Sequence, residues 1–207
     1  MVQKVKRLTM EQNDKPTEIE VISPSGLTKR IGIVKQDGLR KYLTKEEVTD
    51  ILQKMPPGRD KMMLQVLWMT AIRVTELINI KKGDINFIKR RMTIRWQKSR
   101  RWRYRIIPVH PQLVDILQLF TAALNDSDRV FPYTRQLIFM VCKKYMACSP
   151  HKLRHSFAVN FLEQYKNPKA LLVLKELLGH SRIETTMIYL KLVPTDMSNA
   201  IEQINFI

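Results

Sequence analysis

The spacing of apolar residues is different in one segment of this chain, and that difference limits what the chain can fold into. Between residues 85 and 109 apolar and polar residues alternate, with Met92, Ile94 and Trp96 two positions apart. A period of two is typical of half-buried strands. On both sides of this segment apolar residues recur every three to four positions, as in amphipathic helices. We therefore expect a mainly α-helical fold with one small three-stranded antiparallel sheet, an α+β protein.

Start and stop signals mark the expected helices. Thr44 followed by Glu47 is a capping box, and Pro-Pro-Gly at residues 56–58 stops the helix that it begins. A second helix should run from residue 59 to about 71, and a third from residue 73 to a stop at residues 82–84. After the sheet we expect helices over residues 112–124, 134–147, 151–164, 168–178, 182–190 and 196–205.

The two ends of the chain differ from its middle. Residues 1–38, an N-terminal extension, hold two short apolar stretches around the turn sequence Ser-Pro-Ser-Gly. This pattern predicts either a hairpin or a disordered arm. Residues 39–194 are expected to form one domain. In the tail, residues 195–207, four apolar residues form a stripe at helical spacing: Met197, Ala200, Ile201 and Ile204.

The charge of the chain points to its partner. There are 36 Lys and Arg against 19 Asp and Glu, a formal net charge of +17. Such a surplus repels itself unless a polyanion supplies the opposite charge, so nucleic acid is the expected partner. An anionic membrane surface is the alternative, but it favours a basic amphipathic helix. With no apolar run near the roughly 20 residues of a membrane span and no secretory signal, we expect a soluble cytoplasmic protein.

Cofactor and metal chemistry have no recognisable motif here. Cys142 and Cys148 are too few for a disulfide framework and lack the spaced Cys and His partners of a zinc site. Free thiols in a reducing compartment are expected. Neither a phosphate-binding glycine loop nor an acidic metal cluster is visible, so we predict no cofactor and no metal.

Residues 89–105 form the densest basic segment. They hold nine Lys and Arg, no acidic residue, and the aromatic residues Trp96, Trp102 and Tyr104. A strand pair of this composition can lie against phosphates and reach into a groove of DNA. For each aromatic ring taken by itself, we expect packing into the core. The residues expected to contact DNA are Arg95, Arg100, Arg101, Arg103 and, on a later helix, Lys152.

Residues 149–158 open a helix that could bind an anion. Spacings of three and four place His151, Arg154 and His155 on one face, near the positive end of the helix. His151 and Arg154 can therefore converge on one anion. By itself this pattern is weak evidence, because a capped helix start with an exposed arginine is common.

Two other segments carry reactive residues beside helix ends. Arg73 stands at a turn-to-helix junction, with Glu76 one turn later. His180 follows Gly179, a helix-stopping glycine, and Tyr189 comes nine residues further on. A surface salt bridge and a buried tyrosine are the ordinary explanations of these patterns, taken singly.

Together, these segments resemble the tyrosine recombinases, the phage integrase family. The residues that carry the resemblance keep the family's order: Arg73, Lys98, His151-x-x-Arg154, Gly179-His180 and Tyr189. The match runs from about residue 41 to residue 194, roughly three quarters of the chain. Residues 39–194 would then be a catalytic domain. The resemblance implies an enzyme that cuts and rejoins DNA through a 3′-phosphotyrosyl intermediate, without metal or ATP.

The roles that the resemblance implies are also those that phosphodiester cleavage requires. The reaction needs a nucleophile, stabilisation of charge on the non-bridging oxygens, and an acid for the departing 5′ oxygen. Tyr189 would be the nucleophile. Arg73 and Arg154 would hold the scissile phosphate, a task that suits the guanidinium fork. His151 would accept the proton of the tyrosine, and His180 would donate to the phosphate.

Lys98 is the best match to the family's general-acid lysine, on the hairpin between the second and third strands. The segment that follows it is longer than the family's usual pattern, so Arg100 or Arg101 could occupy the tip instead. Glu76 is expected to orient the first arginine. His155 corresponds to a supporting residue outside the direct phosphate shell.

Two departures from the family pattern bear on activity. Ala71 and Ile72 stand where the family commonly has Gly-Leu, and glycine is favoured where φ is positive, so a modest change in this turn is expected. Only about 38 residues precede the catalytic region, where the family has an N-terminal domain of the order of a hundred residues. The chain would be either a minimal recombinase or a fragment.

The leading functional hypothesis is site-specific recombination: integration, excision or resolution of a DNA element by a tetramer on double-stranded DNA. In the resembling enzymes a C-terminal helix packs into a neighbouring protomer, and the apolar tail here would do the same or pack on its own domain. A type IB topoisomerase-like activity is the alternative within enzymes. A DNA-binding regulator without the chemistry is a third, which the intact set of site residues argues against.

Overall fold

The computed structural model describes residues 19–22, 28–31, 42–99 and 101–193. The chain divides into two compact units, Met1–Lys41 and Tyr42–Ile207. In the first unit β1 (Ile19–Ile22) and β2 (Thr28–Ile31) pair antiparallel. The predicted tail helix at residues 196–205 lies outside the described residues.

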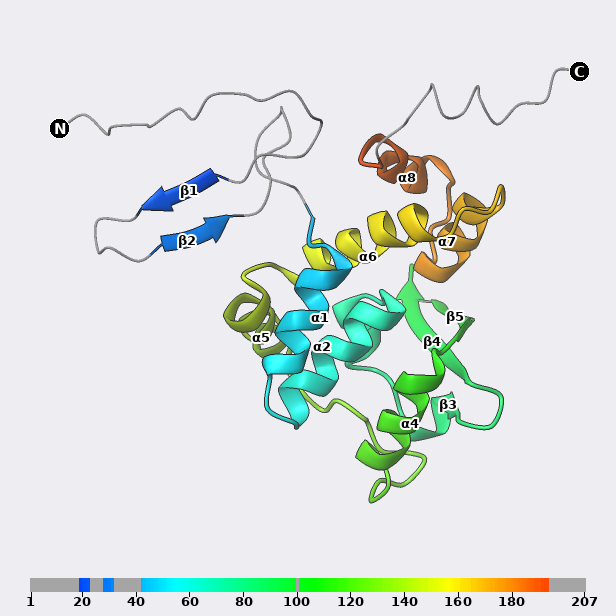
Figure 1. The fold of residues 1–207 in the computed structure, drawn as a ribbon. Coiled ribbons are helices and arrows are strands. Elements are labelled where there is room, and N and C mark those ends of the chain that lie inside the picture. Colours follow the sequence, from blue (N-terminus) through cyan, green and yellow to red (C-terminus); the bar gives the residue numbers. More distant parts are fainter. Residues whose placement is uncertain (1–18, 23–27, 32–41, 100, 194–207) are drawn as a thin grey trace, which may run out of the picture. The chain divides into compact units, whose positions relative to one another are not determined.

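The second unit is mainly helical with one small sheet, as predicted (Figure 1). Before the sheet lie α1 (Lys45–Lys54), α2 (Arg59–Thr70), α3 (Val74–Leu77) and the 3-10 turn η1 (Lys82–Asp84). The strands are β3 (Ile85–Asn86), β4 (Arg91–Lys98) and β5 (Arg101–Pro108). After them come α4 (Pro111–Phe120), α5 (Arg135–Met146), α6 (Pro150–Gln164), α7 (Ala170–Leu178), α8 (Glu184–Met187) and the 3-10 helix η2 (Ile188–Lys191). Among the described helices, none has both the length and the apolar character needed to cross a membrane.

The start and stop signals of the first helix act as expected, whereas three later helices differ from their predicted bounds. The helix predicted at 112–124 ends at Phe120, and the one predicted at 182–190 is a single α-helical turn followed by a 3-10 helix. The hydroxyl of Thr44 accepts from the Glu47 amide at 3.3 Å, and the Glu47 carboxylate accepts from the Thr44 amide at 2.8 Å, which completes the capping box. The third helix is shorter than predicted and ends at Leu77. There the amides of Asn79 and Ile80 bond three residues back rather than four, which tightens and closes the helix.

The sheet has the strand order β3-β4-β5 and is antiparallel throughout. The long pair β4 and β5 runs from Arg91 opposite Pro108 to Lys98 opposite Arg101. Apolar residues of β4 such as Ile94 are fully buried, whereas their neighbours along the strand are not. One face of the sheet therefore covers the helices, as the period of two predicted.

Two apolar clusters form the core of the second unit. The larger joins α1, α2, α4, α5 and the sheet around residues such as Met63. The smaller joins α6 and α7 around residues such as Leu174. The clusters adjoin where α2 turns into α3, because Ala71 belongs to the smaller cluster and Ile72 to the larger. The next residue along the chain is Arg73, so the junction between the cores fixes the backbone at a predicted site residue.

Candidate active site

Arg73 follows the left-handed turn that ends α2. Ala71 has φ 51° and ψ 27°, so the turn is of the kind that favours the glycine usual in the resembling family. Arg73 is the N-cap of α3, and Glu76 reaches back to it. The Glu76 carboxylate accepts from the Arg73 amide at 2.8 Å and from Arg73 Nη1 at 3.0 Å. Since the Arg73 side chain stays 42 % exposed, it is oriented but still open to solvent.

Arg105 of β5 binds the same carboxylate, and sequence reasoning missed it. Its Nη1 donates to Glu76 Oε1 at 2.8 Å and its Nη2 donates to Glu76 Oε2 at 3.0 Å. Burial acts to raise the pKa of Glu76, but the guanidiniums of Arg105 and Arg73 outweigh it and hold that pKa below its ordinary value. The alternation of side chains along a strand could have indicated this position, because Arg105 stands two residues before the buried Ile107 and so lies on the same, core-facing side of β5.

Arg154 lies near the start of α6 and is almost fully buried, at 4 % exposure. Its Nη1 donates to the Ala71 carbonyl at 2.5 Å, and its Nη2 donates to the Leu178 carbonyl at 2.6 Å. Burial, and then the charge of Arg73, lower the pKa of Arg154 to about 10. Arg154 therefore remains a cation at neutral pH.

His180 follows Gly179, which ends α7 with φ 65°. Its Nδ1 lies 2.9 Å from Thr186 Oγ1, and its Nε2 lies 3.3 Å from Arg154 Nη2. Burial and the nearby guanidiniums lower the pKa of His180 to about 4, so the ring is neutral at pH 7. Because an arginine only donates, Nε2 is the acceptor and Nδ1 carries the proton. The predicted role is donation to a phosphate, and donation through Nε2 would require a change in this hydrogen bonding or a second proton.

Tyr189 of η2 is packed into the smaller core cluster, at 2 % exposure. Its ring centroid lies 5.3 Å from that of His155 and 6.5 Å from that of His180. His151 meets His155 at 4.4 Å between centroids, edge to face. Burial raises the pKa of Tyr189, while the charge of Arg154 opposes that shift. His155, the predicted supporting residue, thus lies between His151 and Tyr189.

The predicted DNA-contacting residues lie along the β4-β5 hairpin and on α6. Lys98 is the last residue of β4, and its backbone pairs with that of Arg101. The side chains of Arg101 and Arg103 are exposed, and Lys152 of α6 is half-buried. Arg100 lies outside the described residues. The structure therefore places the backbone of the predicted general acid at the end of an exposed basic hairpin.

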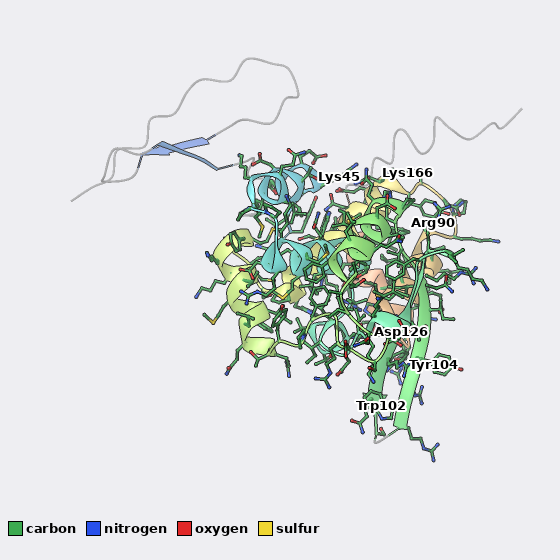
Figure 2. The ribbon with its side chains drawn as sticks, turned by 90° about the horizontal axis from the view of Figure 1, so that it is seen from below. Lys45, Arg90, Trp102, Tyr104, Asp126 and Lys166 are labelled. Atoms are coloured by element: carbon green, nitrogen blue, oxygen red, sulfur yellow. The ribbon has the colours of Figure 1, made fainter. Side chains whose placement is uncertain are left out.

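The prediction for the aromatic residues was wrong in two of three cases. Trp102 is 65 % exposed and Tyr104 is 74 % exposed on β5 (Figure 2). The register explains this, because both stand out of phase with the buried Ile107 and so lie on the outer face of the sheet. Trp96 is half-buried and carries the Arg105 guanidinium 5.3 Å from its ring centroid.

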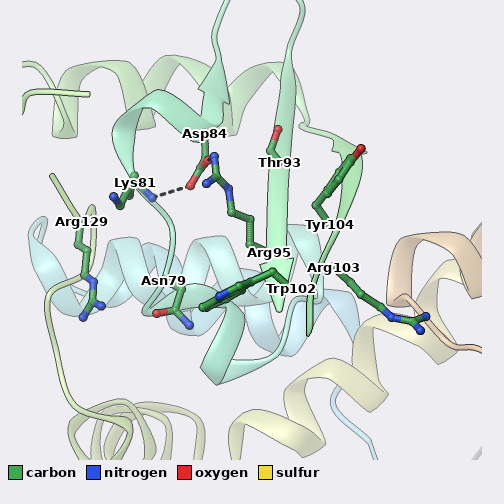
Figure 3. A pocket seen from close by; sticks show the side chains of 9 residues that line it. All are labelled: Asn79, Lys81, Asp84, Thr93, Arg95, Trp102, Arg103, Tyr104 and Arg129. Carbon is green, nitrogen blue, oxygen red and sulfur yellow. Dashed lines mark hydrogen bonds and ion pairs between the residues drawn. The ribbon is translucent and has the colours of Figure 1, made fainter. Parts of the chain in front are cut away.

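Two adjoining hollows flank the β4-β5 hairpin. The first, of about 650 Å³, has Trp102 on one side and the Arg95–Asp84 ion pair of 2.7 Å on another (Figure 3). Lys81 and Arg129 add positive charge to it. The second, of about 850 Å³, contains the candidate site residues Arg73, Glu76, Arg105 and His180. A basic surface therefore leads from the outer face of the sheet to the buried arginines.

Comparison with known proteins agrees with the geometry. The phage integrase family matches residues 41–195. Tyrosine recombinase XerA of Pyrococcus furiosus is 32 % identical over 185 residues, which cover 82 % of this chain and 63 % of the relative. Tyrosine recombinase XerD of Staphylococcus haemolyticus is 31 % identical over 185 residues, which cover 76 % and 60 %. The chain thus spans about three fifths of the length of these relatives.

Solved structures show the same fold. The crystal structure of XerA recombinase matches with a TM-score of 0.60 at 24 % identity, over 78 % of this chain and 61 % of that one. The catalytic domain of bacteriophage HP1 integrase matches with a TM-score of 0.59 at 23 % identity, over 78 % of this chain and 94 % of that one. The predicted fold class is confirmed, and the chain belongs to the phage integrase family.

Proposed function

We propose that this chain breaks and rejoins double-stranded DNA at defined sites, with Tyr189 as the nucleophile. One observation carries the proposal. The buried Tyr189 ring packs against two histidines, and one of them, His180, lies 3.3 Å from the buried Arg154, whose charge acts to lower the pKa of the tyrosine. A tyrosine that served only as packing would need no cation beside it, since a buried charge costs free energy.

The first chemical step joins the tyrosine to DNA. Tyr189 Oη attacks the scissile phosphorus, the new P–Oη bond forms, and the bond from phosphorus to the 5′ oxygen breaks. We assign His151 as the base that accepts the tyrosine proton, with His155 between the two rings. Lys98 is assigned as the acid that donates a proton to the departing 5′ oxygen. The 3′-phosphotyrosyl link keeps the energy of the broken bond, so attack by a 5′ hydroxyl reverses the step and rejoins a strand.

The positive charge at the site stabilises the phosphate during both steps. Arg73 is exposed enough to reach a phosphate, and Arg154 supplies a second cation behind it.

The pKa of Tyr189 is raised by burial, and a tyrosine at 2 % exposure cannot reach DNA from its present place. The short helix η2 must therefore shift when DNA binds.

Duplex DNA and further copies of the same chain are the proposed partners. Two structures that share this fold are XerH bound to difH substrate and the Tn1549 integrase in complex with transposon right end DNA. By analogy we propose that this protein acts with DNA in the cytoplasm, as a tetramer, and that its apolar tail contributes to assembly. DNA affinity that depends on the basic hairpin should fall steeply with salt.

The test is a covalent adduct that depends on Tyr189. Purified protein is incubated with supercoiled DNA carrying its native site, without metal or ATP, and the reaction is trapped with detergent. Tyr189→Phe removes only the hydroxyl and keeps the ring in the core, and Tyr165→Phe, at the exposed end of α6, is the matched control. An adduct with wild type and the control, but not with Tyr189→Phe, is expected.

Other outcomes redirect the assignment. An adduct with relaxation of one-site DNA, but without strand exchange between two sites, would indicate a topoisomerase-like activity. DNA binding without any adduct, also on nicked substrates that trap cleavage, would contradict the proposal and favour a DNA-binding regulator. An adduct that survives in Tyr189→Phe would move the nucleophile elsewhere.

A further inference from the structure

Arg105 of β5 is held in place by contacts within the protein. Its side chain is 11 % exposed, and both of its terminal nitrogens are taken by Glu76. Its guanidinium also lies over Trp96. Its Nε is buried without a hydrogen-bond partner among the described residues, an unfavourable arrangement that the other contacts impose. Arg105 is therefore fixed in place and is not itself a ligand for a phosphate.

The carboxylate that Arg105 holds is shared with Arg73. Glu76 Oε1 accepts from both arginines, at 3.0 Å from Arg73 Nη1 and 2.8 Å from Arg105 Nη1. Glu76 is fully buried, so solvent does not compete for its oxygens. Arginine and carboxylate prefer to pair through two parallel hydrogen bonds. Glu76 Oε2 already accepts from the Arg73 amide at 2.8 Å, so without Arg105 the Arg73 guanidinium could pair with both oxygens of the carboxylate.

Gly179 shows how closely the surroundings fit Arg105. A Cβ at Gly179 would lie 2.7 Å from Arg105 Nη1, which is closer than such atoms approach. The next residue is His180, so the strand arginine also packs under the turn that positions a predicted site histidine. One side chain of β5 thus touches two separate parts of the candidate site.

We propose that Arg105 is a positioning residue of the DNA cleavage reaction, acting through Glu76 on Arg73. The Arg105 guanidinium binds both oxygens of Glu76 and so prevents the carboxylate from pairing with the Arg73 guanidinium through two hydrogen bonds. Arg73 thereby keeps its orientation, and its positive charge remains available to the scissile phosphate. Because Arg105 belongs to β5, it also links the basic hairpin to the phosphate-binding arginines. This inference rests on the proposed function.

The test separates positioning from simple stability. We would compare wild type with Arg105→Gln for the rate of adduct formation on saturating DNA, together with DNA affinity and melting temperature. Arg59→Gln is the matched control, since Arg59 also pairs with a carboxylate, Asp60, and lies over a ring, Tyr133, at the opposite end of α2. We expect a rate roughly 100-fold lower for Arg105→Gln, the size of effect that a small misplacement causes, and little change in affinity.

A second substrate reports on the charge of the phosphate. In a methylphosphonate at the scissile position one non-bridging oxygen is replaced by methyl, so the reacting group is neutral and needs less help from Arg73. On this substrate Arg105→Gln should cleave within a few-fold of wild type, as should Arg73→Ala. A variant that is merely distorted would be slowed equally on both substrates.

The rates of Arg105→Gln on the two substrates decide whether Arg105 is a positioning residue. An unchanged rate for Arg105→Gln on normal DNA, or an equal loss on both substrates, would overturn the inference. If Arg105→Gln fails to fold, Arg105→Lys asks the same question, because lysine has one nitrogen and cannot hold both oxygens of Glu76. If wild type itself forms no adduct on native-site DNA, the proposed function has failed, which is distinct from failure of the role of Arg105.

Discussion

Replacing Glu76 with glutamine tests the charge arrangement of the site directly. The side chain is fully buried and accepts four hydrogen bonds, two from Arg73 and two from Arg105. The amide of glutamine puts donors against guanidinium donors and leaves buried positive charge without a counter-ion. Removing one partner of a buried ion pair costs about 3–5 kcal/mol. We expect Glu76→Gln to lose that much free energy of unfolding.

The assay is urea unfolding at pH 7, with thermal melting as a second measurement. For a protein of this size the expected loss lowers the melting temperature by on the order of 10 °C. Asp50→Asn is the control, because Asp50 forms an exposed i,i+4 pair with Lys54 at 2.7 Å, worth at most about 0.5 kcal/mol. The contrast between the two variants is the measured quantity.

The pH dependence gives the sign of the effect. Since the folded-state pKa of Glu76 lies below its ordinary value of 4.5, its contribution is present above pH 4.5 and is lost as the pH falls through the folded-state pKa. The gap between wild type and Glu76→Gln should therefore narrow in acid. A loss below about 1 kcal/mol at pH 7 would refute a charged, buried Glu76 at this position.

Three further predictions follow from the described residues. Because the pKa of His180 is lowered to about 4 from 6.5, wild type should lose stability as the pH falls from about 6.5 toward 4, and His180→Gln should lose less on melting over that range. Ala71→Gly should change the free energy of unfolding by less than about 1 kcal/mol, because relief at φ 51° offsets the added freedom of the unfolded chain, whereas Ala71→Val should cost more than about 2 kcal/mol in urea. Cys142 is fully buried with its pKa raised to about 12, so a thiol reagent should label it only as fast as the protein unfolds, and rapid labelling of native protein would contradict its burial.

Much of the fold could be predicted because its signals are local. The capping box at Thr44, the stop after it and the alternation through Ile94 depend on neighbours in sequence, and each was found where expected. The one-turn α3 could not be foreseen, because its end at Leu77 follows from the way the chain then turns toward Lys82. The helix propensity of the residues indicates whether a helix can form, but it does not indicate where tertiary contacts end that helix.

For the candidate site, residue types and their order were enough to make a prediction from the family resemblance, but they could not reveal partners that are distant in sequence. The tyrosine, the histidines and the two arginines were predicted from short motifs, whereas Arg105 meets Glu76 across 29 positions. Its role depends on the register of β5, which also decides that Trp102 faces outward. A shift of one residue in register exchanges the two faces of a strand. In a segment rich in both arginine and aromatic residues, the sequence therefore does not determine which of them lie on the buried face.

The surroundings of Arg154 have a consequence for binding. Its two carbonyl partners, on Ala71 and Leu178, belong to the C-terminal ends of α2 and α7, where helix dipoles are negative. Among the described residues no carboxylate lies within 4.0 Å of its guanidinium. Arg154 is thus held by dipoles, which balance a buried cation without neutralising it. An anion that binds there has no ion pair to break, and the two helix ends leave the positive charge of Arg154 available to it.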